Sequence, residues 1–168
     1  LPTRNSLDQL CLNGDLLFSQ DIGYGWRNGV TFADGHYWVG DEIGNLWAVN
    51  ADVAVNYTVG NGKIRHAPMN LMNSDLLIHL QTTSGSTILQ FDTEFKAVTA
   101  VVESGFSPGK PIVLNDYIIT TDSQQVTSLN CQGQCFVVDF ESFRSNGEIS
   151  NVFCNIVLPR NTAEGGYG

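Results

Sequence analysis

The acidic pair Asp41–Glu42 offers the clearest prospect of chemistry, and it lies between two apolar runs in the segment GHYWVGDEIGNLWAVNAD, residues 35–52. Two adjacent carboxyl groups can act as a general acid and base, or they can bind calcium. Both roles need further oxygen donors, and three more acidic residues stand near in the sequence: Asp21, Asp34 and Asp52. Because the pair falls in a predicted tight turn, we interpret it as the solvated tip of a hairpin.

A second candidate site is the segment DIGYGWRNG, residues 21–29, which combines aromatic side chains, glycines and the isolated Arg27. Aromatic rings on an adaptable backbone are typical of loops that recognise a carbohydrate or a peptide. The predicted recognition loop comprises Tyr24, Trp26, Arg27, Asp41 and Glu42. The alternative is that the segment is a connection between two sheets, packed on the fold rather than open to a ligand.

No other segment has the sequence motif of a catalytic site. The serines lack the Gly-x-Ser-x-Gly context of a hydrolase nucleophile, and residues 105–110 lack the ending of a phosphate-binding loop. His36 and His79 each alternate with apolar neighbours, so we interpret them as strand residues whose polar atoms are satisfied. The sequence therefore predicts no catalytic residue, no metal ion and no cofactor.

The four cysteines are Cys11, Cys131, Cys135 and Cys154, and they permit three disulfide pairings. Cys131 and Cys135 could close a short loop, which would leave Cys11 to pair with Cys154. A zinc site would need two close pairs or nearby histidines, whereas the three histidines are scattered. The even number of cysteines, the few lysines and the glycosylation sequon at Asn56 together favour an extracellular or otherwise extracytoplasmic protein.

The charge balance restricts the partners. The chain has 8 basic and 17 acidic residues among its 168, which gives a formal net charge of −9. Binding to phosphates needs clusters of Lys and Arg, so we expect no nucleic acid partner, and the same charge argues against adsorption to anionic lipid. No apolar run approaches the ~20 residues of a membrane-spanning helix, so we expect no membrane insertion.

Short β-rich runs separated by turn signals recur along the chain, whereas helical periodicity is weak even in its best windows, residues 7–17 and 93–102. The predicted strands span residues 16–19, 29–32, 37–40, 46–50, 53–59, 76–80, 87–91, 97–102, 112–114, 117–121, 126–130, 136–140 and 152–158. Many short strands at close spacing indicate an all-β fold, which can be a sandwich, a barrel or a propeller.

An internal repeat discriminates among these folds. Three stretches each read strand, polar turn, strand, polar turn, strand: residues 29–50, 67–92 and 109–130. Successive copies end 42 and 38 residues apart, and a further predicted strand follows each copy. Four strands in about 40 residues are the content of one propeller blade. Small residues such as Gly29 and Ala67 suit the crowded innermost strand of such a blade.

The best copy, residues 33–51, reads ADGHYWVGDEIGNLWAVNA. It resembles the blade repeat of the pyrroloquinoline-quinone-like β-propellers, which typically reads ADG-x-VYVG-x-x-DG-x-LYALDA and is followed by an outer Gly-Lys-x-x-Trp strand. The resemblance covers roughly residues 12–140 and implies an all-β, β-propeller-like array of about three to four four-stranded blades, which we place at residues 1–158. Residues 159–168 are rich in glycine and polar residues, so we expect a flexible tail there. The chain lacks the Gly-Lys-x-x-Trp strand and an adjacent Cys-Cys pair, so we expect no bound quinone.

These observations lead to three functional hypotheses. The first is a non-catalytic extracellular scaffold or binding module that mediates protein–protein or protein–glycan interaction within a larger assembly. The second is a subunit or fragment of a propeller enzyme, either a quinoprotein-like oxidoreductase or a hydrolase, and the third is a β-sandwich adhesion domain whose repeat is accidental. Propellers close with about four to eight blades. Residues 141–158 could form a fourth blade with a strand at residues 7–20, held by a Cys11–Cys154 disulfide, but residues 142–150 are irregular. We therefore expect another protein chain, or copies of this one, to complete the ring.

Overall fold

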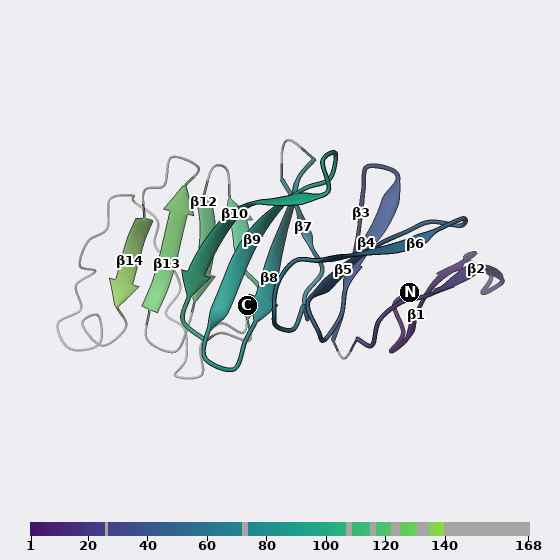
Figure 1. Ribbon diagram of the computed structural model, residues 1–168, viewed down its shortest axis with the longest axis horizontal. Coiled ribbons are helices and arrows are strands. Elements are labelled where there is room, and N and C mark those ends of the chain that lie inside the picture. Colours follow the sequence, from purple (N-terminus) through teal and green to yellow (C-terminus); the bar gives the residue numbers. More distant parts are fainter. Residues whose placement is uncertain are drawn as a thin grey trace. The chain divides into compact units, whose positions relative to one another are not determined.

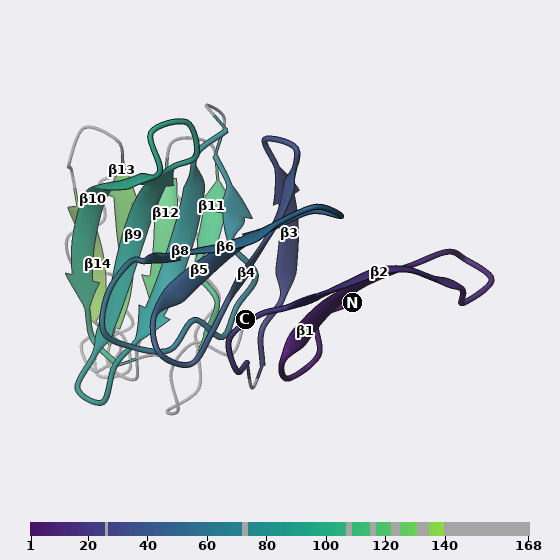
Figure 2. The ribbon, with the colours of Figure 1, turned by 45° about the vertical axis from the view of Figure 1, so that its right-hand side comes forward.

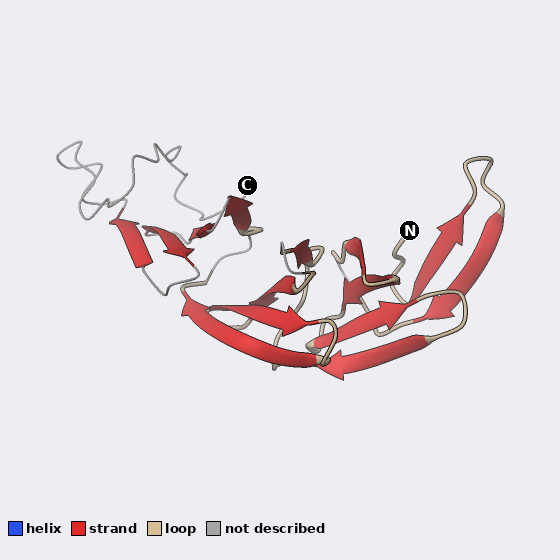
Figure 3. Ribbon diagram, turned by 90° about the horizontal axis from the view of Figure 1, so that it is seen from above, coloured by secondary structure: helices blue, strands red, loops and turns tan. Residues whose placement is uncertain are grey.

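The computed structural model describes residues 1–25, 27–71, 74–106, 109–114, 117–121, 125–130 and 135–139. This part of the chain forms strands and no helix, which confirms the predicted all-β class (Figure 3). Among the described residues there is accordingly no helix that could cross a membrane. The chain divides into two compact units, residues 1–83 with 87–103 and residues 84–86 with the chain from 104 onward.

The first unit contains one hairpin and two four-stranded antiparallel sheets (Figure 1). The hairpin consists of β1 (Ser6–Leu10) and β2 (Leu16–Asp21). The first sheet has the strand order β3 (Val30–Ala33), β4 (His36–Gly40), β5 (Asn45–Val49) and β6 (Ala54–Thr58). The second sheet contains, from one edge to the other, β7 (Met69–Asn70), β8 (Leu76–Gln81), β9 (Ser86–Asp92) and β10 (Ala97–Ser104).

Tight turns connect neighbouring strands of the first sheet. Asp34 and Gly35, between β3 and β4, have φ values of 47° and 71°, and Gly44, between β4 and β5, has φ of 86°. These values confirm the predicted hairpin turns, because glycine adopts this left-handed region without steric cost. Space also requires Gly44, since a Cβ there would lie 1.8 Å from the carbonyl oxygen of Gly60. Asn45, predicted as a turn residue, begins β5 instead.

Both faces of the β3–β6 sheet are covered, because side chains alternate between the faces along each strand. One face packs on the β7–β10 sheet in a core that contains Trp38, Leu46, Ala48, Ile64, Leu76, Ile78, Leu80, Leu89 and Phe91. The other face packs on the hairpin in a core formed by Leu7, Ile22, Val39 and Val49. The first unit is therefore built of three layers, which are the hairpin, the β3–β6 sheet and the β7–β10 sheet (Figure 2).

The short strands β3 and β7 lie side by side in the first unit. The hydroxyl group of Thr31 donates a hydrogen bond to the carbonyl oxygen of Pro68, and the Nδ2 atom of Asn70 donates one to the carbonyl oxygen of Phe32 at 3.4 Å. A Cβ on Gly29 would lie 2.8 Å from the Cβ of Ala67. Small residues are thus required at this crowded approach.

The described residues of the second unit form one four-stranded sheet, in the order β11 (Ile112–Leu114), β12 (Tyr117–Thr121), β13 (Gln125–Asn130) and β14 (Cys135–Asp139). Its neighbouring strands are antiparallel, and Tyr117 of β12 lies opposite Asn130 of β13. The predicted strand at residues 152–158 and the predicted tail at residues 159–168 lie outside the described residues.

The predicted strands that lie within the described residues are confirmed to within two residues at each end. β1 was not predicted as a strand, and the strand expected without exact bounds at the start of the repeat copy at residues 67–92 is the short β7. β1 falls in the window at residues 7–17 that carries weak helical periodicity, yet its residues pair with β2 along their whole length. β7 has only two residues, which is too short for a periodic signal.

Candidate functional site

Asp41 is fully buried, so its interpretation as the solvated tip of a hairpin is wrong. Its Oδ1 atom accepts hydrogen bonds from the backbone N–H groups of Ile43 and Asn45, at 3.0 and 2.9 Å. Its Oδ2 atom accepts from the Nδ2 atom of Asn45 and from the Nε1 atom of Trp47, both at 3.0 Å. Four donors therefore balance the buried carboxylate, and both of its oxygen atoms are used within the protein.

The Asp41 carboxylate holds the β4–β5 turn from inside and positions the segments around it. A Cβ on Gly23 would lie 2.1 Å from its Oδ2 atom, so the aromatic segment can approach only through a glycine. The backbone N–H of Ile64 donates to the carbonyl oxygen of Asp41 at 2.9 Å. Asp41 is thus a structural residue, and it is not available to a ligand or a metal ion. The sequence signal that could have identified it is the presence of an amide and an indole four and six residues after the aspartate.

Glu42 follows Asp41 but directs its side chain to a different group. Its two carboxylate oxygens accept hydrogen bonds from the Nε and Nη2 atoms of Arg65, at 2.9 and 2.8 Å. The Nζ atom of Lys63 lies 3.9 Å from the Oε2 atom. This bidentate pairing with Glu42 raises the pKa of the Arg65 guanidinium above its ordinary value.

Tyr24 lies beside this ion pair. The backbone N–H of Glu42 donates to the carbonyl oxygen of Tyr24 at 2.9 Å. The Tyr24 side chain is 48% exposed. The structure thus brings together Tyr24 and Glu42 of the predicted recognition loop, and it adds Lys63 and Arg65.

Sequence reasoning missed Lys63 and Arg65 because they come from the linker between β6 and β7. The position of this linker is fixed by two backbone hydrogen bonds of 2.8 Å between Lys63 and Gln81 of β8. Arg27 is exposed and makes no hydrogen bond or ion pair with the described residues. Trp26 lies outside the described residues. The Tyr24 surface is therefore defined here by Tyr24, Glu42, Lys63 and Arg65.

The Tyr24 surface combines an exposed aromatic ring with a planar carboxylate–guanidinium pair and a lysine. Aromatic rings stack on the apolar face of a sugar or a peptide side chain, and paired charges offer directed hydrogen bonds at the rim. Arg65 holds both oxygen atoms of Glu42, so this carboxylate is not placed as a general base. The arrangement suits recognition of a ligand.

The two histidines that were interpreted as satisfied strand residues differ. The Nδ1 atom of His36 lies 2.8 Å from the carbonyl oxygen of Asp34, in hydrogen-bonding distance. His79 is only 2% exposed, and neither of its ring nitrogens has a hydrogen-bond partner among the described residues, so the interpretation is wrong for His79. Burial, and then the charge of His66 with its ring centroid 5.4 Å away, lowers the pKa of His79 to about 4.

The cysteine and sequon predictions are only partly within the described residues. Cys11 is exposed, and it forms no disulfide with another described residue. Cys131 and Cys154 lie outside those residues, and of Cys135 only the backbone, in β14, is described. Asn56 is exposed on β6, and the hydroxyl group of Thr58 donates to the Oδ1 atom of Asn45 at 2.9 Å. In the described part of the chain no three His, Cys, Asp or Glu residues are grouped as metal ligands.

No family model matches this chain, and no curated protein sequence matches it either. The chemistry of the Tyr24 surface and the layering of the first unit are therefore the basis for a functional proposal.

Proposed function

We propose that the protein is a non-catalytic, extracytoplasmic scaffold and binding module with a β-propeller-like array of about three to four four-stranded blades. In this proposal another protein chain, or a second copy of this one, completes the propeller. The Tyr24 surface binds a protein or a glycan within the resulting assembly. The observation that carries the proposal is an exposed aromatic ring beside a bidentate ion pair, on a stack of sheets.

The layering of the first unit supports a blade-like arrangement. The β3–β6 sheet has an apolar core on each face, as a sheet stacked between two neighbours requires. The strands of each four-stranded sheet follow one another in chain order, which is the connectivity of a blade.

The hairpin supports the idea of a missing partner. It has only two strands, and its outer half exposes four leucines: Leu10, Leu12, Leu16 and Leu17. Exposed apolar side chains near an open strand edge favour pairing with another chain. Sedimentation equilibrium of the full chain over a wide concentration range tests this part. Species heavier than the 18.3 kDa monomer support completion by copies, and a monomer at every concentration contradicts it.

The recognition role is tested with Tyr24→Ala against a panel of glycans and extended peptides. An exposed aromatic anchor typically contributes about 2 kcal/mol or more to binding, so we expect an affinity loss of about 30-fold for the ligands that bind. Phe95→Ala is the matched control, because Phe95 is 76% exposed in the turn between β9 and β10, on another element. Absence of binding to the whole panel, or equal affinity of Tyr24→Ala and the wild type, contradicts the recognition role.

A further inference from the structure

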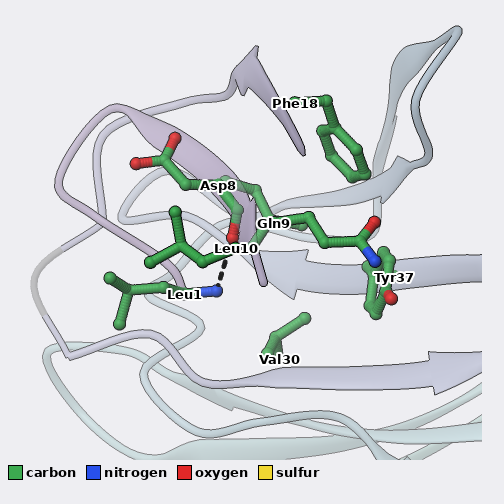
Figure 4. A pocket seen from close by; sticks show the side chains of 8 residues that line it. Leu1, Asp8, Gln9, Leu10, Phe18, Val30 and Tyr37 are labelled. Carbon is green, nitrogen blue, oxygen red and sulfur yellow. Dashed lines mark hydrogen bonds between the residues drawn. The ribbon is translucent and has the colours of Figure 1, made fainter. Parts of the chain in front are cut away.

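A pocket of about 240 Å³ lies between the hairpin and the β3–β6 sheet (Figure 4). Its walls include Leu7, Gln9, Leu10, Phe18, Val30 and Tyr37, and this set is called the hairpin pocket below. It is separate from the Tyr24 surface and shares no residue with it.

Strand register explains why these side chains converge. Gln9 of β1 lies opposite Phe18 of β2, so both side chains are on the same face of the hairpin. On the β3–β6 sheet, Val30 and Tyr37 lie on the face that packs against the hairpin. Leu7 is buried in the core at the closed end of this layer. Gln9 lies two residues after Leu7 on the same face of β1, and its side chain is polar. The pocket begins at this position.

The pocket contains two polar groups that have no hydrogen-bond partner among the described residues. Neither the amide of Gln9 nor the hydroxyl group of Tyr37 makes a hydrogen bond with another described residue, and Figure 4 shows the Gln9 amide directed toward Tyr37. A few polar groups beside apolar side chains in a concave site are typical of ligand pockets, where they set the orientation of the ligand.

Two lining residues of the hairpin pocket carry a charged group, which are the carboxylate of Asp8 and the ammonium of Leu1. Asp8 alternates with Leu7 and Gln9, so its carboxylate lies on the other face of β1, where the hydroxyl groups of Ser6 and Ser19 donate to it at 2.9 and 2.6 Å. These two hydrogen bonds hold the pKa of Asp8 below its ordinary value. The carbonyl oxygen of Asp8 accepts a hydrogen bond from the amine of Leu1 at 2.7 Å. With the Asp8 carboxylate turned away and the Leu1 ammonium bonded to a backbone carbonyl, the remaining lining side chains are uncharged, which favours a neutral ligand.

We propose that the hairpin pocket binds a neutral aromatic ring with one hydrogen-bonding substituent, as in a phenol or an indole. The volume exceeds the roughly 150 Å³ of a cavity that binds benzene, which leaves room for the substituent. The rings of Phe18 and Tyr37, with centroids 6.4 Å apart, provide aromatic contacts, and Leu7 and Val30 provide aliphatic ones. The Gln9 amide and the Tyr37 hydroxyl can each donate to or accept from the substituent.

The proposal is tested by titrating the ¹⁵N-labelled full chain with p-cresol and, in parallel, with toluene, which lacks the hydroxyl group. We expect saturable chemical-shift changes at residues 7–10, 18, 30 and 37. One net hydrogen bond corresponds to an affinity ratio of about 2- to 10-fold in favour of p-cresol. Absence of saturable changes at these residues overturns the proposal.

Substitutions separate binding in this pocket from a general effect on the fold. Gln9→Leu is expected to abolish or reduce the preference for p-cresol while toluene still binds, and Val30→Trp is expected to fill the pocket and abolish binding of both. Tyr57→Phe is the control for Tyr37→Phe, because Tyr57 packs beside the core on the other face of the sheet. An unchanged p-cresol preference in both Gln9→Leu and Tyr37→Phe overturns the assignment of the polar groups.

Two sources of such a ring are distinguished by adding N-acetyltyrosinamide to the titration. Binding at least as tight as that of p-cresol indicates a tyrosine side chain of a peptide. Binding of p-cresol alone indicates a free small aromatic molecule, and failure of both ligands overturns the proposal.

Discussion

Asp41 is expected to be among the most sensitive polar positions of the first unit. Replacement by alanine removes a buried acceptor from four donors, which are the N–H groups of Ile43 and Asn45, the Nδ2 atom of Asn45 and the Nε1 atom of Trp47. A hydrogen bond to a charged group contributes about 1.5–3 kcal/mol. The side chains of Asn45 and Trp47 are only partly buried, so water can replace part of the lost acceptor.

We therefore expect Asp41→Ala to lower the free energy of unfolding by about 3–5 kcal/mol, close to the loss from breaking a buried charge network. For a chain of this length the midpoint of thermal unfolding falls by about 2–4 °C per kcal/mol, so the expected decrease is about 6–20 °C. For Asp41→Asn we expect about half of this decrease in the free energy of unfolding. The amide oxygen of asparagine still accepts from the two turn N–H groups, whereas its NH₂ group faces two donors.

The measurement is equilibrium urea denaturation of the full chain, followed by tryptophan fluorescence and circular dichroism. Asp92→Ala is the matched control, since Asp92 accepts two backbone N–H groups at 2.8 Å in an exposed turn without an indole partner. Its expected loss is about 1 kcal/mol or less. If Asp41→Ala falls within about 1 kcal/mol of Asp92→Ala, the reasoning about the buried carboxylate is refuted.

Three further predictions concern other groups. The pKa of His79 is about 4 in the folded chain and about 6.5 in the unfolded chain. The folded state therefore holds this histidine neutral, and the free energy of unfolding should decrease by about 3 kcal/mol as the pH falls from 6.5 to 4. Urea denaturation at pH 7 and pH 4 should show a smaller pH dependence for His79→Leu, and an equal dependence would refute the assignment. Arg65→Lys should lower the free energy of unfolding, measured by urea denaturation, by about 1 kcal/mol or less, because the pair with Glu42 is partly exposed. The same substitution should weaken the binding of any ligand that depends on the planar pair of the Tyr24 surface. An affinity equal to that of the wild type would count against that role. Expression in a glycosylating secretory host should yield a product whose mass falls on enzymatic deglycosylation, and Asn56→Gln should remove that decrease; a wild-type mass unchanged by the enzyme would contradict the sequon prediction.

Strand prediction succeeded where burial alternates along the chain. In β4 and β5, Trp38, Leu46 and Ala48 face one core while Val39 and Val49 face the other, so runs of apolar residues between glycine turns were sufficient. In β1 the signal failed, because only Leu7 is buried and the next residue on the same face is Gln9. A strand whose inner face becomes the wall of a pocket loses the alternation on which its prediction depends.

Only part of the candidate site was predicted, because the rest depends on contacts between separate segments of the chain. Tyr24 and Glu42 stand in two turn-like segments that are recognisable from sequence, but Arg65 reaches them only because its linker pairs with β8. The burial of Asp41 depends on contacts with Gly23 and Trp47 from separate segments. Tertiary contacts of this kind are not encoded in local periodicity, so a surface turn was the expected interpretation of the sequence alone.

The Tyr24 surface separates the groups that position the site from the groups that would contact a ligand. Backbone hydrogen bonds join the three segments of the site, with the N–H of Glu42 on the carbonyl oxygen of Tyr24 and the N–H of Ile64 on that of Asp41. The buried carboxylate of Asp41 fixes the turn between them. The side chains of Tyr24, which is exposed, and Arg65, which pairs with Glu42 at the surface, therefore contribute little to the fold, because backbone hydrogen bonds set the positions of their segments. Substitutions at these two side chains should change binding without a large change in stability, whereas substitutions at Asp41 should affect both, because it holds the segments in place.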